Sequence, residues 1–353
     1  MTARGIPGAR AVDRVRALCR DDGDERTLRI ALLDELRHHI GYDVYVWLLT
    51  DPETEVGSAP LANAPSLAGL PRLIGAKYLT STNRWTALDE PVATLLAATG
   101  GDLGRSLVWR DVLSAYDVKD VASLVFRDNH GCWGWLDLWR RGAASAFSAS
   151  ERSYLAAMAA PITGALRRCQ ARTFDQTSVP LDRTGPVVLV LSPRLEVKAQ
   201  TPATEAYLRA LIPPDGDRRP IPAGAYNVAA QLLAAEAGVD HHEPSARVHL
   251  EGGRWMTLRA ARVDAAGKSG DHDIAVTIEP SSPTERRTLF ARSHALSLRE
   301  SELIECLAHG ADTRTIAQQL YLSEHTVQDH LKSIFAKTGA RNRRTLLARL
   351  AGQ

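Results

Sequence analysis

Three polar side chains near the end of the chain have the types and the spacing of groups that contact the edges of base pairs. Gln328, Asp329 and Lys332 supply an amide, a carboxylate and an ammonium group. Positions i and i+4 of a helix share a face, so Val327 and Leu331 would form the opposite, apolar side. Each of these polar groups can hydrogen-bond to a particular base edge in the major groove. The pattern predicts a helix with one buried face and one face suited to nucleic acid.

Basic residues gather around these side chains, although the chain as a whole is almost neutral. The formal net charge is only +2. The final segment nevertheless carries a run of cations, which are Lys332, Lys337, Arg341, Arg343, Arg344 and Arg349. Phosphate contacts supply much of the affinity for DNA. The sequence therefore predicts that this end of the chain binds any nucleic-acid partner.

Local signals divide residues 296–353 into four short helices. Polar residues can cap the starts of the first three, and glycine ends two of them. In chain order these residues are Ser297 with Glu300, Gly310, Asp312 or Thr313, Ser323 and Gly339. Tyr321 and Leu322 make a tight turn between the second and third helices. This order is the one that places a helix in the major groove.

The same segment resembles the helix-turn-helix domain of LuxR/NarL-type regulators. The resemblance rests on Leu296, Arg299, Glu300, Gly310, Ile316, Ala317, Leu320, Ser323, Thr326, Val327, His330, Lys337, Asn342 and Arg343. It implies sequence-specific DNA binding, with Gln328, Asp329 and Lys332 in the base-facing positions. It also implies that the C-terminal helix forms a dimer contact.

The resemblance implies a larger set of DNA-contacting residues. Thr326, His330 and Lys337 take supporting or backbone-positioning roles in it. The full set is Ser323, Thr326, Gln328, Asp329, His330, Lys332, Lys337, Arg341 and Arg343.

Two charged positions leave alternatives open. Asp329 can accept a hydrogen bond from cytosine N4, or it can pair with Lys332 one turn away. For Arg299 and Glu300, helix capping and an internal ion pair are preferred to contact with DNA.

Upstream, the chain shows two mixed α/β regions. Residues 11–172, with the order helix, strand, helices, hairpin and helix, resemble a GAF-like sensory domain. Residues 187–280, with two short strands, helices and three strands, resemble a PAS-like domain. Residues 173–186 and 279–296 have the composition of linkers. The predicted fold is multidomain α+β, GAF-like then PAS-like, followed by an all-α four-helix helix-turn-helix domain at 294–353.

The hydrophobic periodicity of the first region predicts its elements. Residues 11–40 have helical spacing, 91–99 look helical, and 148–172 form a long helix. Residues 121–127 and 132–140 read as strands joined by a turn, which predicts a β-hairpin.

Four tryptophans of the first region are candidates for an apolar ligand pocket. They are Trp47, Trp109, Trp133 and Trp135. Trp133, Trp135 and Trp139 share one face of a strand, with Asp137 among them, and ligand sites are mostly apolar with a few polar groups. Ordinary core packing is the alternative, and it is preferred.

Several other classes of site are excluded or disfavoured. The four cysteines are far apart, which predicts free thiols rather than a zinc site or disulfides. Residues 240–243 (Asp-His-His-Glu) are expected to be a solvated loop rather than a metal site, and residues 267–269 (Gly-Lys-Ser) lack the spacing of a phosphate loop. We expect no metal, no cofactor and no catalytic group.

The sequence therefore predicts a cytoplasmic, non-enzymatic transcription regulator. Its expected partners are double-stranded DNA and a second copy of the chain, and RNA polymerase and a small-molecule effector are further candidates. No apolar run is long enough to span a membrane. Two alternatives stay open: a constitutive DNA-binding oligomer with scaffold domains upstream, and a small-molecule enzyme with a regulatory tail.

Overall fold

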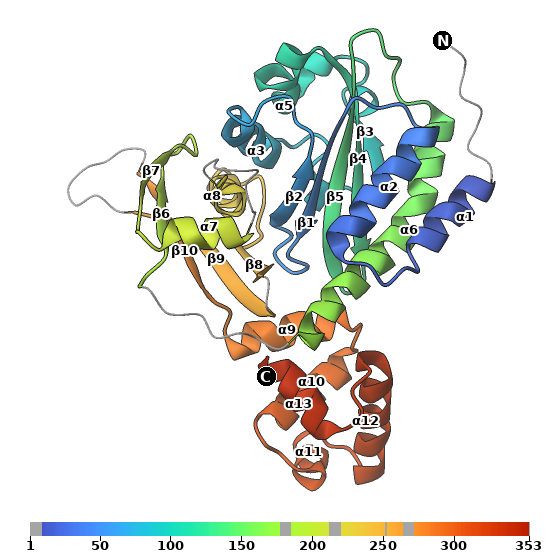
Figure 1. Ribbon diagram of the computed structural model, residues 1–353, viewed down its shortest axis with the longest axis vertical. Helices are drawn as coiled ribbons and strands as arrows, with labels where there is room; N and C mark the ends of the chain where they lie inside the picture. Colours follow the sequence, from blue (N-terminus) through green and yellow to red (C-terminus); the bar gives the residue numbers. More distant parts are fainter. Residues whose placement is uncertain (1–8, 177–184, 212–219, 251–252, 264–271, 353) are drawn as a thin grey trace. The chain divides into compact units, whose positions relative to one another are not determined.

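The computed structural model describes residues 9–176, 185–211, 220–250, 253–263 and 272–352 (Figure 1). The chain forms two compact units. The first comprises Met1–Leu166, Arg183–Val248 and Thr257–Glu279, and the second comprises Arg167–Asp182, His249–Met256 and Pro280–Gln353. The three-domain division predicted from the sequence stays a prediction.

The first unit contains a five-stranded antiparallel sheet in the order β2-β1-β5-β4-β3. Its strands are β1 (Val44–Thr50), β2 (Gly57–Ala62), β3 (Val92–Thr94), β4 (Val118–Asp128) and β5 (Gly131–Arg141). β4 and β5 form the predicted hairpin and extend beyond the predicted strand ends. The central strand β5 is buried along almost its whole length, as expected for a strand covered on both faces.

Helices cover both faces of this sheet: α2 and α6 lie on one side, and α3 and α5 on the other (Figure 1). The helices of this part of the chain are α1 (Ala9–Leu18), α2 (Glu25–His39), α3 (Leu70–Leu79), α4 (Leu95–Ala98), α5 (Leu107–Asp111) and α6 (Ala149–Arg172). Short 3₁₀ turns occur at Trp85–Ala87, Leu103–Arg105, Leu113–Tyr116 and Thr173–Asp175. The long helix predicted over 148–172 is thus confirmed.

Two helix predictions need correction. Residues 11–40 form two helices, because the Asp24 side chain accepts backbone N–H groups at the start of α2 and begins a new helix there. Residues 91–99 begin as strand β3 rather than as helix. Pairing of Val92–Thr94 with β4 overrides the local helical preference.

A second five-stranded sheet has the order β7-β6-β10-β9-β8. Its strands are β6 (Val188–Leu191), β7 (Val197–Gln200), β8 (Ser245–Leu250), β9 (Arg254–Arg262) and β10 (Ile274–Pro280). Two helices accompany it, α7 (Thr204–Leu211) and α8 (Ala223–Glu236). Within the first unit, α8 packs against α3 and β2 (Figure 1).

A buried ion pair joins the two sheet regions of the first unit. The Arg247 guanidinium on β8 contacts the Asp51 carboxylate, which follows β1, with Nη2–Oδ1 and Nε–Oδ2 distances of 2.6 Å. Only 1% of the Asp51 surface is exposed. Burial alone would raise the pKa of Asp51, but the charge and hydrogen bonds of Arg247 hold that pKa below its ordinary value.

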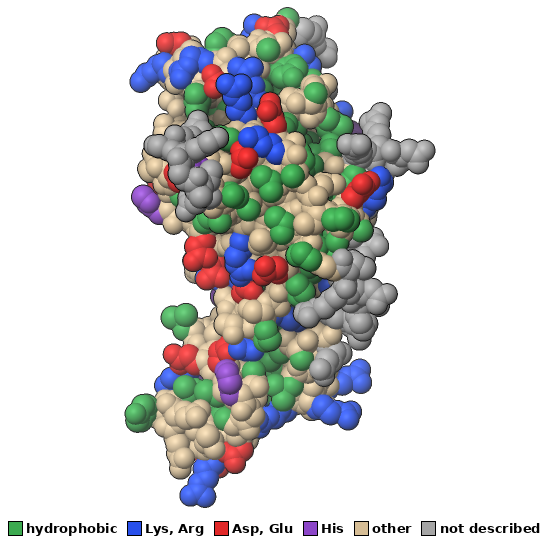
Figure 2. All heavy atoms as spheres, turned by 90° about the vertical axis from the view of Figure 1, so that its left-hand side faces the viewer, with side chains coloured by type: hydrophobic (Ala, Val, Ile, Leu, Met, Phe, Trp, Pro, Cys, Tyr) green, Lys and Arg blue, Asp and Glu red, His purple; other side chains and the backbone are tan. Residues whose placement is uncertain are grey.

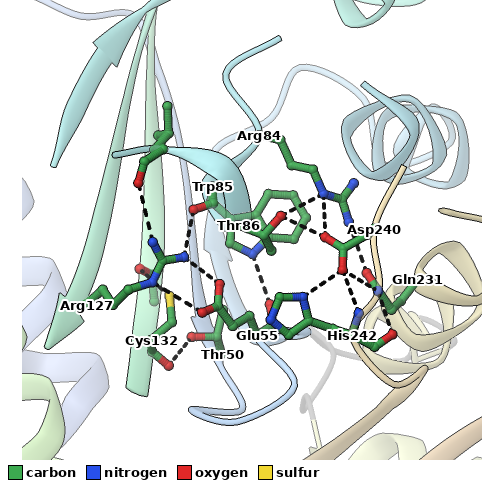
Figure 3. A network of polar contacts seen from close by, with 12 residues as sticks. Thr50, Glu55, Arg84, Trp85, Thr86, Arg127, Cys132, Gln231, Asp240 and His242 are labelled. Carbon is green, nitrogen blue, oxygen red and sulfur yellow. Dashed lines mark hydrogen bonds and ion pairs between the residues drawn. The ribbon is translucent and has the colours of Figure 1, made fainter. Parts of the chain in front are cut away.

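Asp240 forms a second junction, which corrects the expectation of a solvated loop at residues 240–243. Its carboxylate is buried and lies 2.8 Å from Arg84 Nε and 2.6 Å from His242 Nδ1 (Figure 3). Gln231 Nε2 donates to it as well, at 3.1 Å. The hydrogen bond with Asp240 raises the pKa of His242. The sequence pattern missed this junction because Arg84 lies far from Asp240 along the chain.

The sequence predicted free cysteines, no metal site and no membrane-spanning segment. Cys19, Cys132 and Cys169 are buried free thiols, and Cys306 is a half-buried one. Within the described ranges, no group of three or more His, Cys, Asp or Glu side chains could hold a metal ion. In the same ranges, no helix is both long enough and apolar enough to cross a membrane. Residues 267–269 lie outside the described residues.

The first prediction concerns the buried ion pair. Asp51→Asn should lower the free energy of unfolding of the first unit by about 3 kcal/mol, because it leaves the buried Arg247 without its full counter-charge. The loss should shrink as the pH falls below about 4, where unfolded Asp51 is protonated. Tryptophan fluorescence during urea unfolding measures it.

The matched control is Asp117→Asn, which removes a carboxylate from the exposed pair with Lys119. We expect a change of less than about 1 kcal/mol for this variant. Equal losses for the two variants would contradict the role assigned to the buried pair.

The second unit is mainly helical. Its helices are α9 (Pro283–Ser293), α10 (Leu298–Ala308), α11 (Thr313–Gln319), α12 (Glu324–Thr338) and α13 (Arg343–Ala351). The predicted linker at 279–296 is wrong, since α9 occupies most of it. Ser282 and Glu285 form a capping box, and Pro283 occupies the first turn, where proline is compatible with a helix.

The hydrophobic core of this unit includes residues from outside the predicted 294–353 domain. Leu289 and Phe290 of α9 are fully buried, and Phe174 and Trp255 stack with ring centroids 5.4 Å apart. The Arg286 guanidinium lies over the Phe174 ring and donates to the carbonyls of the last turn of α13. Burial lowers the pKa of Arg286 to about 10. The helix-turn-helix therefore shares its core with α9.

The second prediction follows from this shared core. A fragment covering residues 294–353 should be less stable than one covering 280–353 by at least about 3 kcal/mol, because it lacks two buried side chains of α9. Urea unfolding followed by far-ultraviolet circular dichroism measures the difference. Leu298→Ala in the longer fragment is the control, since Leu298 is exposed. Equal stability of the two fragments would show that α9 contributes nothing.

Candidate nucleic-acid interface

α11 and α12 are joined by a tight turn, as predicted. Asp312 caps α11 and Ser323 caps α12 through side-chain oxygens that accept backbone N–H groups. Tyr321 adopts a left-handed φ of 54° in the turn, and its side chain is exposed. The Leu322 N–H then bonds to the Ala317 carbonyl at 2.8 Å. These local bonds fix the angle at which α12 leaves α11.

The two faces of α12 divide as the sequence predicts. The buried face carries Val327, Leu331 and Ile334. Gln328, Asp329 and Lys332 are exposed. Figure 2, which views the molecule from the side of Figure 1 that lies away from α12, shows further Lys and Arg side chains on the second unit. The exposed face of α12 itself carries an amide, a carboxylate and an ammonium group.

Asp329 and Lys332 pair with each other. Lys332 Nζ lies 3.0 Å from Asp329 Oδ1, and His325 Nε2 lies 3.5 Å from Asp329 Oδ2. The hydrogen bond and the charge of Lys332 lower the pKa of Asp329. Of the two alternatives for Asp329, the structure shows the pairing. Because both side chains are largely exposed, this pair can open at little cost.

A buried carboxylate connects α10 to α12. Glu300 accepts hydrogen bonds from the Ser297 N–H, the Ser333 hydroxyl and the Lys337 ammonium, each at 2.6 Å. Burial alone would raise its pKa, but these donors lower the pKa of Glu300 to about 2. Lys337, predicted as a supporting residue, therefore pairs with Glu300 and sets the position of α12.

The other residues of the predicted DNA-contacting set differ in their contacts and in their exposure. The Ser323 hydroxyl lies 2.8 Å from the Thr326 hydroxyl at the start of α12. His330 is half-buried, while Arg341 is exposed. The half-buried Arg343 guanidinium donates to the Ala311 carbonyl. Of the predicted DNA-contacting set, six residues are exposed, which are Ser323, Gln328, Asp329, Lys332, Lys337 and Arg341. Among these six, Asp329, Lys332 and Lys337 are held in ion pairs.

Arg299 is structural, as preferred, but its ion-pair partner is not Glu300. Its guanidinium lies 2.7 Å from Glu302 and also 2.7 Å from the Leu320 carbonyl, just before the tight turn. Helix spacing gave no signal for the contact with Leu320, because the two residues belong to different helices.

The four candidate pocket tryptophans do not form one site. Trp135 lines a cavity of the first unit, together with Asp137 and Trp139. Trp47 packs on Phe126, and Trp133 donates to Asp128 at the end of the hairpin. Trp109 donates to the Val118 carbonyl at 2.9 Å. Core packing therefore accounts for Trp47 and Trp133. Trp135, Asp137 and Trp139, which the sequence placed together on one face of a strand, line the cavity.

These helices define a helix-turn-helix domain. Residues 294–350 match the family described as bacterial regulatory proteins, luxR family. The chain therefore carries a luxR-family domain at these residues. The monoamine regulon transcriptional regulator of Klebsiella aerogenes is 43% identical to the chain over 54 residues, which is 15% of this chain and 24% of that relative. The chain thus matches about a quarter of the length of this curated relative.

Two solved structures are similar to the chain at a much lower level. One is SdiA in complex with octanoyl-rac-glycerol, with 13% identity, a TM-score of 0.29, and coverage of 98% of this chain and 94% of that chain. The other is a bacteriophytochrome from the photosynthetic bacterium R. palustris, with 12% identity, a TM-score of 0.30, and coverage of 77% and 62%. At these scores neither structure says anything about function.

The third prediction concerns the Glu300 carboxylate. In the fragment 280–353, Glu300→Gln should lower the free energy of unfolding by about 2 kcal/mol at neutral pH, because it removes the charge that pairs with Lys337. A carboxylate with a lowered pKa stabilises the fold above the unfolded pKa of about 4.5, and this contribution disappears as the pH falls toward about 2. The two proteins should therefore converge in stability at acid pH, as urea unfolding would show.

The control for this prediction is Glu302→Gln, which removes a charge from an exposed pair on the same helix. This variant should lower the free energy of unfolding by less than about 1 kcal/mol at any pH. A loss in Glu300→Gln that persists unchanged at acid pH would contradict the prediction.

Proposed function

We propose that this protein is a sequence-specific DNA-binding transcription regulator that acts as a dimer on an inverted-repeat operator. The luxR-family match over residues 294–350 carries the proposal. The exposed polar face of α12 supports it, since Gln328, Asp329 and Lys332 can meet base edges without disturbing the buried face once the exposed Asp329–Lys332 pair opens. Ser323, Thr326 and Arg341 would contact the backbone.

The upstream residues serve in this proposal as GAF-like and PAS-like sensory regions. Two antiparallel sheets with flanking helices are consistent with that role. A small-molecule effector would favour one arrangement of the dimer and so change its fit to two half-sites. RNA polymerase would be the downstream partner, and the protein would act in the cytoplasm. The alternative is a constitutive DNA-binding oligomer whose upstream regions are scaffolds.

The fourth prediction tests the base-facing position. Full-length protein should select an inverted repeat from a pool of random duplexes, with an affinity that falls as salt rises. Lys332→Ala should weaken binding to the selected site by roughly tenfold and relax the preference at one base position of each half-site. Arg341→Ala should instead weaken binding evenly across sequences and reduce the salt slope by about one.

Lys119→Ala is the control, because it also removes one exposed ammonium, far along the chain from α12. It should leave both affinity and sequence preference unchanged. If wild-type protein selected no common sequence and bound no duplex at low salt, the proposed function would be wrong. If Lys332→Ala kept the full sequence preference, Lys332 would not contact a base.

A further inference from the structure

The second sheet of the first unit, with the strand order β7-β6-β10-β9-β8, has two faces of different character. Paired residues of antiparallel strands project on the same face of a sheet. Val190 of β6 pairs with Ala199 of β7 and with Ala275 of β10, and Val188 pairs with Thr277. Because Val188 and Val190 are two positions apart, these five residues share one face.

Strand β9 continues this face. The Val263 N–H bonds to the Asp273 carbonyl at 2.9 Å, which fixes the register of β9 against β10. Two residues further along each strand, Ala261 therefore lies beside Ala275. Arg259 follows on the same face after another two residues. The face thus extends over four neighbouring strands.

Exposure separates the two faces of this sheet. The opposite face is buried and packs on α8, since a Cβ atom on Gly224 would lie 3.2 Å from Leu258 Cδ2. Its members are 0% exposed, and they are Leu189, Leu191, Leu258, Ile274 and Val276. The first face is half-buried or exposed at each position, and its apolar and neutral members are Val188, Val190, Ala199, Ala261, Val263, Ala275 and Thr277. We call this set the open face.

An ion pair lies at each end of the open face. At one end, Lys198 Nζ on β7 lies 2.6 Å from Asp273 Oδ1, directly before β10. At the other end, Arg259 Nη1 on β9 lies 4.0 Å from Glu279 Oε2 on β10. The two cations and two anions cancel, so the face lacks the excess of positive charge that nucleic acid needs. An apolar centre between balanced charges instead suits a protein surface of the same kind.

We propose that two copies of this chain pair through the open face. A twofold axis in the plane of the face exchanges its two ends, as a contact between identical surfaces requires. The rotation places Lys198 opposite Glu279 of the second copy, and Asp273 opposite Arg259 of the second copy. Symmetry makes each of these two contacts twice. The apolar centres meet around the axis.

The centre and the ends of the open face contribute differently to this pairing. Small side chains such as Ala261 and Ala275 let two sheets pack face to face at a spacing of about 10 Å. Removal of Val188, Val190 and their neighbours from water then supplies the affinity. Each exposed ion pair adds little by itself. Because a wrong orientation would oppose like charges, the ends select the orientation.

A twofold contact in the first unit matches the symmetry of the operator in the proposed function. Dimeric helix-turn-helix proteins read inverted repeats because the twofold axis of the protein coincides with that of the DNA. The open face supplies such an axis without any contribution from α12. Only the meaning of the pairing for DNA rests on the proposed function.

The fifth prediction tests the charged ends by sedimentation equilibrium of the full chain without DNA, in which wild-type protein should be a dimer. Lys198→Glu combined with Asp273→Lys keeps the internal pair but places like charges opposite Glu279 and Arg259 of the second copy. The dissociation constant of the dimer should rise roughly a hundredfold, because four exposed contacts become repulsive. Part of the loss should be recovered at high salt, which screens the repulsion.

Reversing the other end as well, by Arg259→Glu and Glu279→Lys, makes the two ends complementary again. This fourfold variant should dimerise with a dissociation constant within about threefold of the wild-type value, since the four substitutions act as one coupled set. The matched control is Glu205→Arg with Arg209→Glu, which reverses an exposed ion pair on α7. It should dimerise as wild type does.

Ala261→Arg tests the apolar centre separately, because it places a bulky cation at an exposed position of the open face. It should weaken dimerisation by at least about tenfold, and circular dichroism verifies the fold of each variant. The proposal is overturned if wild-type protein is monomeric, if the twofold variant or Ala261→Arg dimerises as wild type does, or if the fourfold variant regains nothing.

DNA selection by the same samples separates this proposal from the proposed function. Selection of an inverted repeat by wild-type protein that is monomeric without DNA would overturn the pairing through the open face alone. Dimerisation that responds to the charge reversals, without any DNA selection, would overturn the proposed function and leave the pairing standing.

Discussion

The placement of the candidate nucleic-acid-binding helix depends on one desolvated carboxylate. Glu300 completes the capping box of α10 with Ser297, and its side chain also accepts hydrogen bonds from Ser333 and Lys337 of α12. A carboxylate buried without donors would be costly, so its two hydrogen bonds from Ser333 and Lys337 constrain α12 in both rotation and translation. The exposed face of α12 is therefore set by a contact on its buried side.

Buried charged side chains also join the two sheet regions of the first unit. Its two sheet regions meet through the Asp51–Arg247 and Arg84–Asp240 pairs and through the packing of α8 on α3. Buried ion pairs demand specific geometry more than they add stability. The cavity beside Trp135 is lined by residues of both α3 and α8.

The sequence predicted the helix-turn-helix well because its signals are local. Caps at Ser297 and Ser323, the stop at Gly339 and the apolar stripe of α12 each depend on residues within a few positions of one another. The hairpin of β4 and β5 was found for the same reason. Long-range features were missed. α9 looked like a linker because of its prolines and charges, and nothing in the sequence placed Asn227 beside the tryptophans of β5.

The sequence by itself determined which residues of α12 face outward, because helical periodicity and capping follow from local chemistry. It also determined the presence of a luxR-family motif. The tertiary structure alone decided that Lys337 pairs with Glu300, that Asp240 is buried against Arg84, and that α9 completes the core of the second unit. These contacts join residues far apart in the chain. Their side chains lose solvent only when the chain folds, so the energetic effect of each pairing depends on the tertiary structure.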